Sequence, residues 1–167
     1  MEAKHISPQL VMFSTYIPNF QFSGLNSLDL VKKRNSVEGK EVVRVAIAAM
    51  KDAAAGSDWN FTNKLRLLEA EQQSRRLSHG KSIDMYKASI ESAKRSGFIH
   101  EQGLACEKAA FYFMRMKKED MAFEYFKQAR ECYESWGSIV KVEFIQRELD
   151  GLNWVPLTST STSRSSF

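Results

Sequence analysis

The chain has 167 residues, of which 43% are hydrophobic and 26% charged, with only three prolines and eight glycines. This composition is typical of one soluble globular domain and favours long helices over strand-and-turn folds. The formal net charge of +4 comes from interleaved acidic and basic residues, which indicates solvated helix faces rather than a nucleic-acid surface. The sequence shows neither a secretory signal nor a run of about 20 apolar residues. We therefore expect a cytoplasmic protein without membrane contact.

Residues 1–19 form a poorly defined N-terminal segment. They are apolar and aromatic, but Pro8 and Pro18 restrict any helix between them to a short length. The same residues could instead cover an exposed end of a helical domain. From Phe20 onwards apolar residues recur at intervals of three, and the stretch ends in cations that suit a helix C-terminus. The pattern predicts a helix up to about Arg34, with its apolar positions at Phe22, Leu25 and Leu28.

Three more helices are predicted in the middle of the chain. Apolar spacing predicts helices over residues 37–55 and 60–77, with Asn60 as the N-cap of the latter. We expect His79 and Gly80 in a short link. The next helix carries a 3-4-3 apolar spacing that places four residues on one stripe: Ile83, Tyr86, Ile90 and Ala93.

The last three predicted helices cover residues 98–116, 119–136 and 138–149. The first of these is apolar on more than one face, which predicts an interior position between other helices. A glycine follows four of the predicted helices, and Gly97 in particular is expected in the left-handed conformation that ends a helix. The four glycines are Gly56, Gly97, Gly137 and Gly151.

An internal repeat appears when the chain is shifted by 40 residues. The shift preserves the phase of two consecutive helices together with their terminal glycine, and a single helix pair of this kind cannot bury both of its faces. Residues 20–55 are expected to form a third, more divergent pair. The matched positions are Ala70 with Ala110, Ile83 with Phe123, Tyr86 with Phe126, Lys87 with Lys127, Glu91 with Glu131, and Gly97 with Gly137.

These elements predict an all-α fold, a right-handed stack of antiparallel helix pairs of the tetratricopeptide-like kind with about seven helices. The period exceeds the roughly 34 residues of the commonest tetratricopeptide unit, so the helices should be longer. We expect the helical domain over residues 20–150. Residues 151–167 form a C-terminal tail that is rich in Ser and Thr and is expected to be disordered from about residue 158.

The segments 63–76, 85–113 and 126–149 resemble the helical region of large multidomain signalling proteins. The most specific parts are the pattern G-F-I-H-E-x-x-L-A-x-E-x-A-A-F-Y at 97–112 and C-Y-x-x-W-G at 132–137. In that family the region follows a serine/threonine-kinase-like domain and an AAA-type ATPase, and it precedes histidine-kinase or cyclase domains. None of those domains is found in the chain. The resemblance therefore implies a detached helical piece of such a protein or a fragment from a truncated gene model.

No pattern for catalysis is found. Gly80–Lys81–Ser82 resembles the end of a phosphate-binding loop, but position 75 is arginine where that motif requires glycine. The three histidines are far apart, and His100 and Cys106 point to different sides of one helix, so a zinc site is not expected. We predict no enzymatic activity, no cofactor and no small-molecule substrate. The two cysteines, Cys106 and Cys132, are expected to be small buried groups rather than a disulfide.

Candidate partner-binding residues are Glu71, Glu101, Glu107 and Arg130, on the middle helices. One interpretation is that they anchor a partner peptide on the concave surface of the stack. The other is that the glutamates form salt bridges or hydrogen bonds between helices, with Lys64, Lys108 or Arg130 as partners. Four aromatic residues, Tyr125, Phe126, Tyr133 and Trp136, could line a ligand groove, but their helical register favours the core.

The predicted function is a non-catalytic protein–protein interaction or scaffold module, because stacked helix pairs offer extended surfaces for a protein or peptide partner. The alternative is a regulatory helical spacer of a larger signalling ATPase or kinase.

Overall fold

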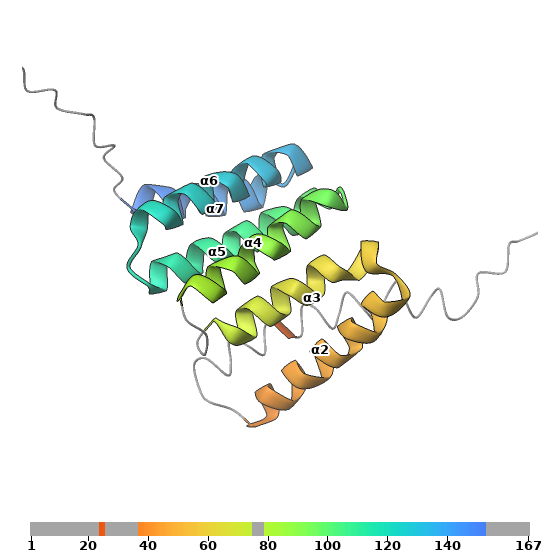
Figure 1. The fold of residues 1–167 in the computed structure, drawn as a ribbon. Helices are drawn as coiled ribbons and strands as arrows, with labels where there is room; N and C mark the ends of the chain where they lie inside the picture. The colour runs from red at the N-terminus through yellow and green to blue at the C-terminus, as the bar shows by residue number, and fades with distance from the viewer. Residues whose placement is uncertain (1–23, 26–36, 75–78, 153–167) are drawn as a thin grey trace, which may run out of the picture.

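The computed structural model describes residues 24–25, 37–74 and 79–152, and all regular structure in these ranges is helical (Figure 1). The all-α class is therefore confirmed for the described part. The helices are α2 (Val37–Gly56), α3 (Asp58–Gln73), α4 (His79–Arg95), α5 (Ile99–Arg115), α6 (Glu119–Trp136) and α7 (Ile139–Gly151). None of them is long and apolar enough to cross a membrane.

Consecutive helices run antiparallel, and each packs against the next along the chain. The connections α2–α3, α4–α5 and α6–α7 lie along one edge of the stack, at the right of Figure 1, whereas α5–α6 lies at the opposite edge. Helix α3 also contacts α5 directly. The odd-numbered helices α3, α5 and α7 therefore begin at the same edge.

Helix boundaries mostly follow the apolar pattern, with three corrections. The prediction of Asn60 as an N-cap was wrong, because α3 begins at Asp58 with Ser57 as its N-cap. Asn60 lies in the first turn instead, where its Nδ2 donates a hydrogen bond of 2.9 Å to Ser57 Oγ. The predicted link at His79 and Gly80 was also wrong, because both belong to α4.

The third correction concerns the glycines at two helix ends. Gly56 and Gly151 are the last residues of α2 and α7 rather than stops outside them. The predicted helix over residues 20–34 lies outside the described residues except for Gly24 and Leu25, which are helical and buried. The segment 1–19 and the tail beyond residue 152 lie outside them entirely.

Gly97 and Gly137 end their helices in the same way, as the repeat predicts. Both have a left-handed backbone, with φ of +72° and +84°. The next amide in each case donates a hydrogen bond to a carbonyl five residues earlier, Phe98 N to Ala93 O at 3.1 Å and Ser138 N to Tyr133 O at 3.0 Å. This bond completes the Schellman arrangement that satisfies the last carbonyls of a helix.

The side chains matched by the 40-residue shift have matching environments. Ala70 and Ala110 are both fully buried, and Tyr86 and Phe126 are 1% and 0% exposed. The paired lysines and glutamates are all exposed. One pair of equivalent contacts differs in chemistry: Tyr86 contacts Glu71, whereas the ring of Phe126 packs edge-on against that of Phe111 at 5.1 Å.

Helix α5 lies in the interior of the stack, as predicted. Nine of its residues are buried, including Ala105, Ala109 and Phe113. Its glycine, Gly103, allows α6 to approach closely, because a β-carbon there would lie 3.0 Å from Tyr133 Cε1. Because Gly103 has no side chain, the ring of Tyr133 on α6 can fill the space beside the backbone of α5.

Candidate functional site

The predicted site residue Glu71 lies on α3 and is 2% exposed. Its Oε1 accepts a hydrogen bond of 2.5 Å from the hydroxyl of Tyr86 on α4. Burial and the neighbouring Glu71 carboxylate raise the pKa of Tyr86 well above the ordinary value of a tyrosine. This pair therefore joins the two helices of one unit through a buried, charge-assisted hydrogen bond.

Glu107 occupies a comparable position on α5 and is 6% exposed. Its Oε2 accepts hydrogen bonds from the Tyr133 hydroxyl at 2.7 Å and from Lys141 Nζ at 2.9 Å. Burial and the carboxylate of Glu107 raise the pKa of Tyr133. The lysine nitrogen also lies 5.4 Å from the centre of the Tyr133 ring. One carboxylate thus joins α5, α6 and α7.

Glu101 lies in the first turn of α5 and is 6% exposed. Its Oε1 lies 3.4 Å from Lys64 Nζ on α3 and 3.6 Å from His100 Nε2. Lys64 is itself only 12% exposed, and its Nζ lies 4.8 Å above the ring of Phe98. The salt bridge between Glu101 and Lys64 is one that the sequence pattern predicted as an alternative to partner binding.

These contacts form a polar row, defined here as Lys64, Glu101, Glu107 and Lys141. The row runs across α3, α5 and α7, with one ion pair between each two successive odd-numbered helices. Its two positive and two negative charges balance. Since each carboxylate already has a cation beside it, the row chiefly fixes the spacing of the odd-numbered helices.

Arg130, the fourth predicted site residue, lies on α6 and does not belong to this row. Its Nη1 donates a hydrogen bond of 2.7 Å to Gln146 Oε1 on α7, and its Nε lies 3.3 Å from Glu134 Oε1. The predicted residues therefore fall into separate contacts between helices rather than one site.

Large apolar side chains are exposed at the edge where α6 gives way to α7. We call this surface the aromatic edge and define it as His100, Trp136, Ile139 and Val140. Trp136 is 51% exposed, and Ile139 and Val140 are 72% and 77% exposed. The imidazole of His100 stacks on the indole of Trp136, with ring centres 5.2 Å apart and planes inclined by 29°. The stacking covers part of the indole, which remains half exposed.

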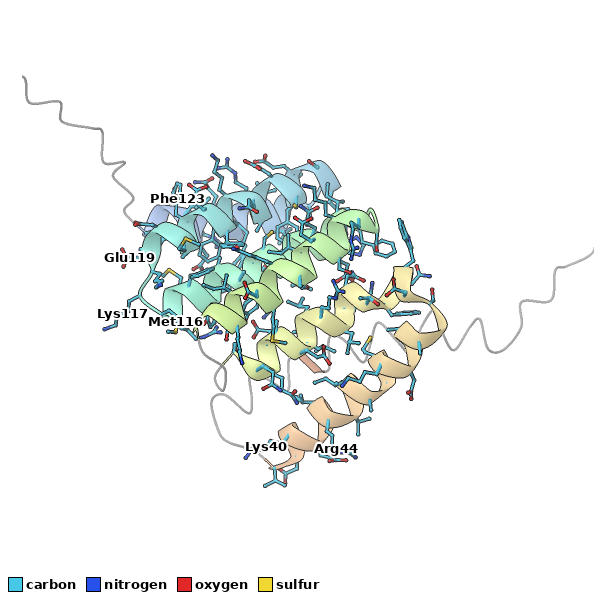
Figure 2. All side chains as sticks on the ribbon, in the orientation of Figure 1. Lys40, Arg44, Met116, Lys117, Glu119 and Phe123 are labelled. Carbon is cyan, nitrogen blue, oxygen red and sulfur yellow. The ribbon has the colours of Figure 1, made fainter. Side chains whose placement is uncertain are left out.

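Exposed apolar groups elsewhere are more scattered. Met116 and Met121 flank the α5–α6 connection at the opposite edge, and Figure 2 shows Met116 there beside Lys117 and Glu119. Trp59, 59% exposed, lies in the first turn of α3. Val42 and Val45 on α2 are about two-fifths exposed. These residues do not share the stacked pair that marks the aromatic edge.

Sequence reasoning placed Trp136 with Tyr125, Phe126 and Tyr133 in the core. The other three are buried, but the prediction was wrong for Trp136. Trp136 is the last residue of α6, and its ring is covered only in part, by His100 and Tyr133. The sequence did carry a signal for the exposure of Trp136. Four of the five residues 136–140, where α6 ends and α7 begins, are apolar or glycine.

The two cysteines are both buried and free. They lie on the adjoining helices α5 and α6, and a hydrogen bond with Cys132 together with burial raises the pKa of the Cys106 thiol. Within residues 24–25, 37–74 and 79–152, no three His, Cys, Asp or Glu side chains come together in a manner suited to a metal ion.

No family model, curated protein or solved structure matches the chain.

Proposed function

We propose that the chain is a non-catalytic interaction or scaffold module, a right-handed tetratricopeptide-like stack that binds a protein or peptide partner in the cytoplasm. The observation that supports this proposal is the aromatic edge. Tryptophan is among the residues that contribute most to binding when it becomes buried in an interface. A stacked, half-exposed indole beside two exposed aliphatic side chains offers such an anchor, and its ordering cost is reduced because the stack already holds it.

The predicted glutamates contribute indirectly in this proposal. Glu101 binds Lys64 and so ties the first turn of α5 to α3, and Glu107 binds Lys141 and so ties the middle of α5 to the first turn of α7. Those turns carry His100, Ile139 and Val140. In this proposal the polar row fixes the helices that carry the aromatic edge, and the partner contacts the apolar side chains themselves. An apolar helix or peptide is the chemistry that fits.

Affinity capture with the full chain tests the proposal. Immobilised wild-type protein is compared with Trp136→Ser and Val140→Ser variants, and with a Val45→Ser variant as a matched control. Val45 is also an exposed valine, but it lies on α2. We expect a set of proteins that the wild type and the Val45 variant retain and the two edge variants lose, because the edge supplies the apolar contacts.

The proposal fails if all four proteins retain the same set or if none retains a specific partner. In that outcome the spacer alternative would remain. Circular dichroism on each variant provides the control for folding, since all three substitutions lie on exposed positions and should leave the helical signal unchanged.

A further inference from the structure

Cys106 on α5 and Cys132 on α6, called here the thiol pair, lie in the interface between these two helices. Both are free and buried, and they are the two cysteines of the chain. Their side chains share a hydrogen bond. Two sulfur atoms in such contact need to approach by only a short distance to reach the disulfide bond length of about 2 Å. The pair is therefore placed for a covalent link between α5 and α6.

The two helices approach closely at this point. A β-carbon added at Gly103, one turn before Cys106, would lie 3.1 Å from Cys132 Cβ. Cys132 thus packs directly against the turn of α5 that leads to Cys106. One turn further along the interface, Ala109 and Ala129 are both fully buried. A disulfide requires Cα atoms within about 7 Å of each other, and a crossing lined by such small residues favours that separation.

The thiol pair has no counterpart in the other repeat unit. Forty residues earlier the chain carries Arg66 and Ser92. Ser92 is buried like Cys132, so a serine fits this place in the fold. Arg66 extends instead to donate a hydrogen bond of 3.2 Å to the backbone oxygen of Ala88. The repeat therefore requires sulfur at neither position, and packing alone does not account for two thiols that face each other.

The two thiols differ in access and in acidity. Cys132 is 7% exposed, whereas Cys106 is fully buried. The hydrogen bond with Cys106 lowers the pKa of the Cys132 thiol. The same bond, together with burial, raises the pKa of the Cys106 thiol. Because the thiolate is the form that reacts with oxidants, Cys132 is the thiol that an oxidant attacks first, and Cys106 is placed to react next.

We propose that the thiol pair is a reversible redox site, at which hydrogen peroxide links α5 to α6 through a Cys106–Cys132 disulfide within the folded chain. The Cys132 sulfur attacks one peroxide oxygen, the O–O bond breaks, and the departing hydroxide takes up the thiol proton and leaves as water. Cys132 is then a sulfenic acid. The Cys106 sulfur attacks the Cys132 sulfur and displaces hydroxide, which takes the Cys106 proton to form a second water. The two sulfurs lose two electrons in all, and one peroxide is reduced to two waters.

Treatment of the full chain with hydrogen peroxide, followed by intact-mass measurement and peptide mapping, tests the proposal. We expect the chain to lose the mass of two hydrogen atoms and to yield a linked peptide pair that contains Cys106 and Cys132. Peptide mapping separates this loss from oxygen added to methionine. The link closes a loop of about 25 residues, so the oxidised chain should melt about 5–10 °C higher than the reduced chain. Dithiothreitol should reverse both the link and the rise in melting temperature.

Two variants separate the roles of the thiols. Cys132→Ser, which copies the residue of the other unit, should show neither the mass loss nor the shift in melting temperature. Cys106→Ala leaves Cys132 without its partner, so the sulfenic acid should persist and react with dimedone. This dimedone adduct should form at least about tenfold faster than the Cys106 adduct of the Cys132→Ser variant. Circular dichroism of the reduced variants provides the control for folding.

A folded wild-type chain whose thiols stay reduced, are oxidised singly or form disulfides only between chains would overturn the proposal. A link that forms only in urea would also overturn it, because the bond would then belong to the unfolded chain. The same holds for a link that lowers the melting temperature, since the folded interface would then oppose the bond. Faster trapping at Cys106 than at Cys132 would overturn the assigned order of attack.

Discussion

The contact between Glu71 and Tyr86 offers a direct test of how the two repeat units relate. The positions 40 residues later carry Phe111 and Phe126, whose rings pack edge-on. The same place in the fold thus holds a polar pair in one unit and an apolar pair in the other. We predict that the apolar pair can be transplanted, so that each single change destabilises the chain but the double variant Glu71→Phe/Tyr86→Phe does not.

The magnitudes follow from burial. Both side chains are at most 2% exposed, so neither Glu71 nor Tyr86 can replace a lost contact with bulk water. Tyr86→Phe removes a hydrogen bond to a charged group and should cost about 1.5–3 kcal/mol. Glu71→Phe deprives the Tyr86 hydroxyl of its carboxylate acceptor and should cost about 1–3 kcal/mol. The double variant should lie within about 1 kcal/mol of the wild type, because a buried polar pair contributes little more than a well-packed apolar one.

Urea unfolding followed by far-ultraviolet circular dichroism gives the free energy of unfolding of all four proteins. The expected result is a coupling energy of at least about 1.5 kcal/mol between the two positions. If the two single losses add up in the double variant to within about 0.5 kcal/mol, the pair is not a unit and the reasoning from the repeat is refuted.

Three further predictions concern buried positions in α4, α5 and α6. Gly103→Ala should destabilise the fold by about 1–3 kcal/mol in thermal melts, since the added β-carbon would lie 3.0 Å from Tyr133. Gly80→Ala, where a β-carbon would meet nothing within 4 Å among the described residues, should be neutral or stabilising in the same melts. Phe126→Ala should cost about 3–5 kcal/mol because its side chain is fully buried, and a measured loss below about 1 kcal/mol would contradict that placement. The pKa values of Tyr86 and Tyr133 are raised in the folded state, so the folded chain keeps two protons that the unfolded chain loses above about pH 10. The free energy of unfolding should therefore fall as the pH rises through this value. Replacing both tyrosines with phenylalanine should flatten that fall when unfolding is measured as a function of pH.

Much of the described fold could be predicted because helix periodicity is a local property. The bounds of α6 were predicted correctly, and the 40-residue shift identified Gly97 and Gly137 as equivalent helix ends. Helix starts were harder. Asn60 has the chemistry of an N-cap, but Ser57 takes that position, and Asn60 bonds to it from the first turn.

One helix end lacks the glycine that marks the ends of α4 and α6. Lys117 has a positive φ of 54°, and the following amide, Lys118 N, donates a hydrogen bond of 3.0 Å to Phe113 O. This is the Schellman arrangement of the glycine ends, but a lysine occupies the left-handed position. Tertiary packing of α5 against α6 outweighs the local cost there.

The candidate site was less predictable than the fold. The acidic residues Glu71, Glu101 and Glu107 could be recognised from the sequence, and one predicted salt-bridge partner, Lys64, was correct. The tyrosine partners could not be found, because they depend on which residues face each other between helices. The exposure of Trp136 depends in turn on where α6 ends relative to its neighbours, which periodicity alone does not report.

The contact of every helix with its successor has a consequence for the order of folding. Contacts between neighbours in sequence close short loops, so the chain should fold quickly for its size. Helices α5 and α6 share the most extensive interface, and small residues and aromatic rings fill it. Amide protons of this pair should therefore exchange with solvent most slowly, and protection should decline outwards along the stack towards α2 and α7.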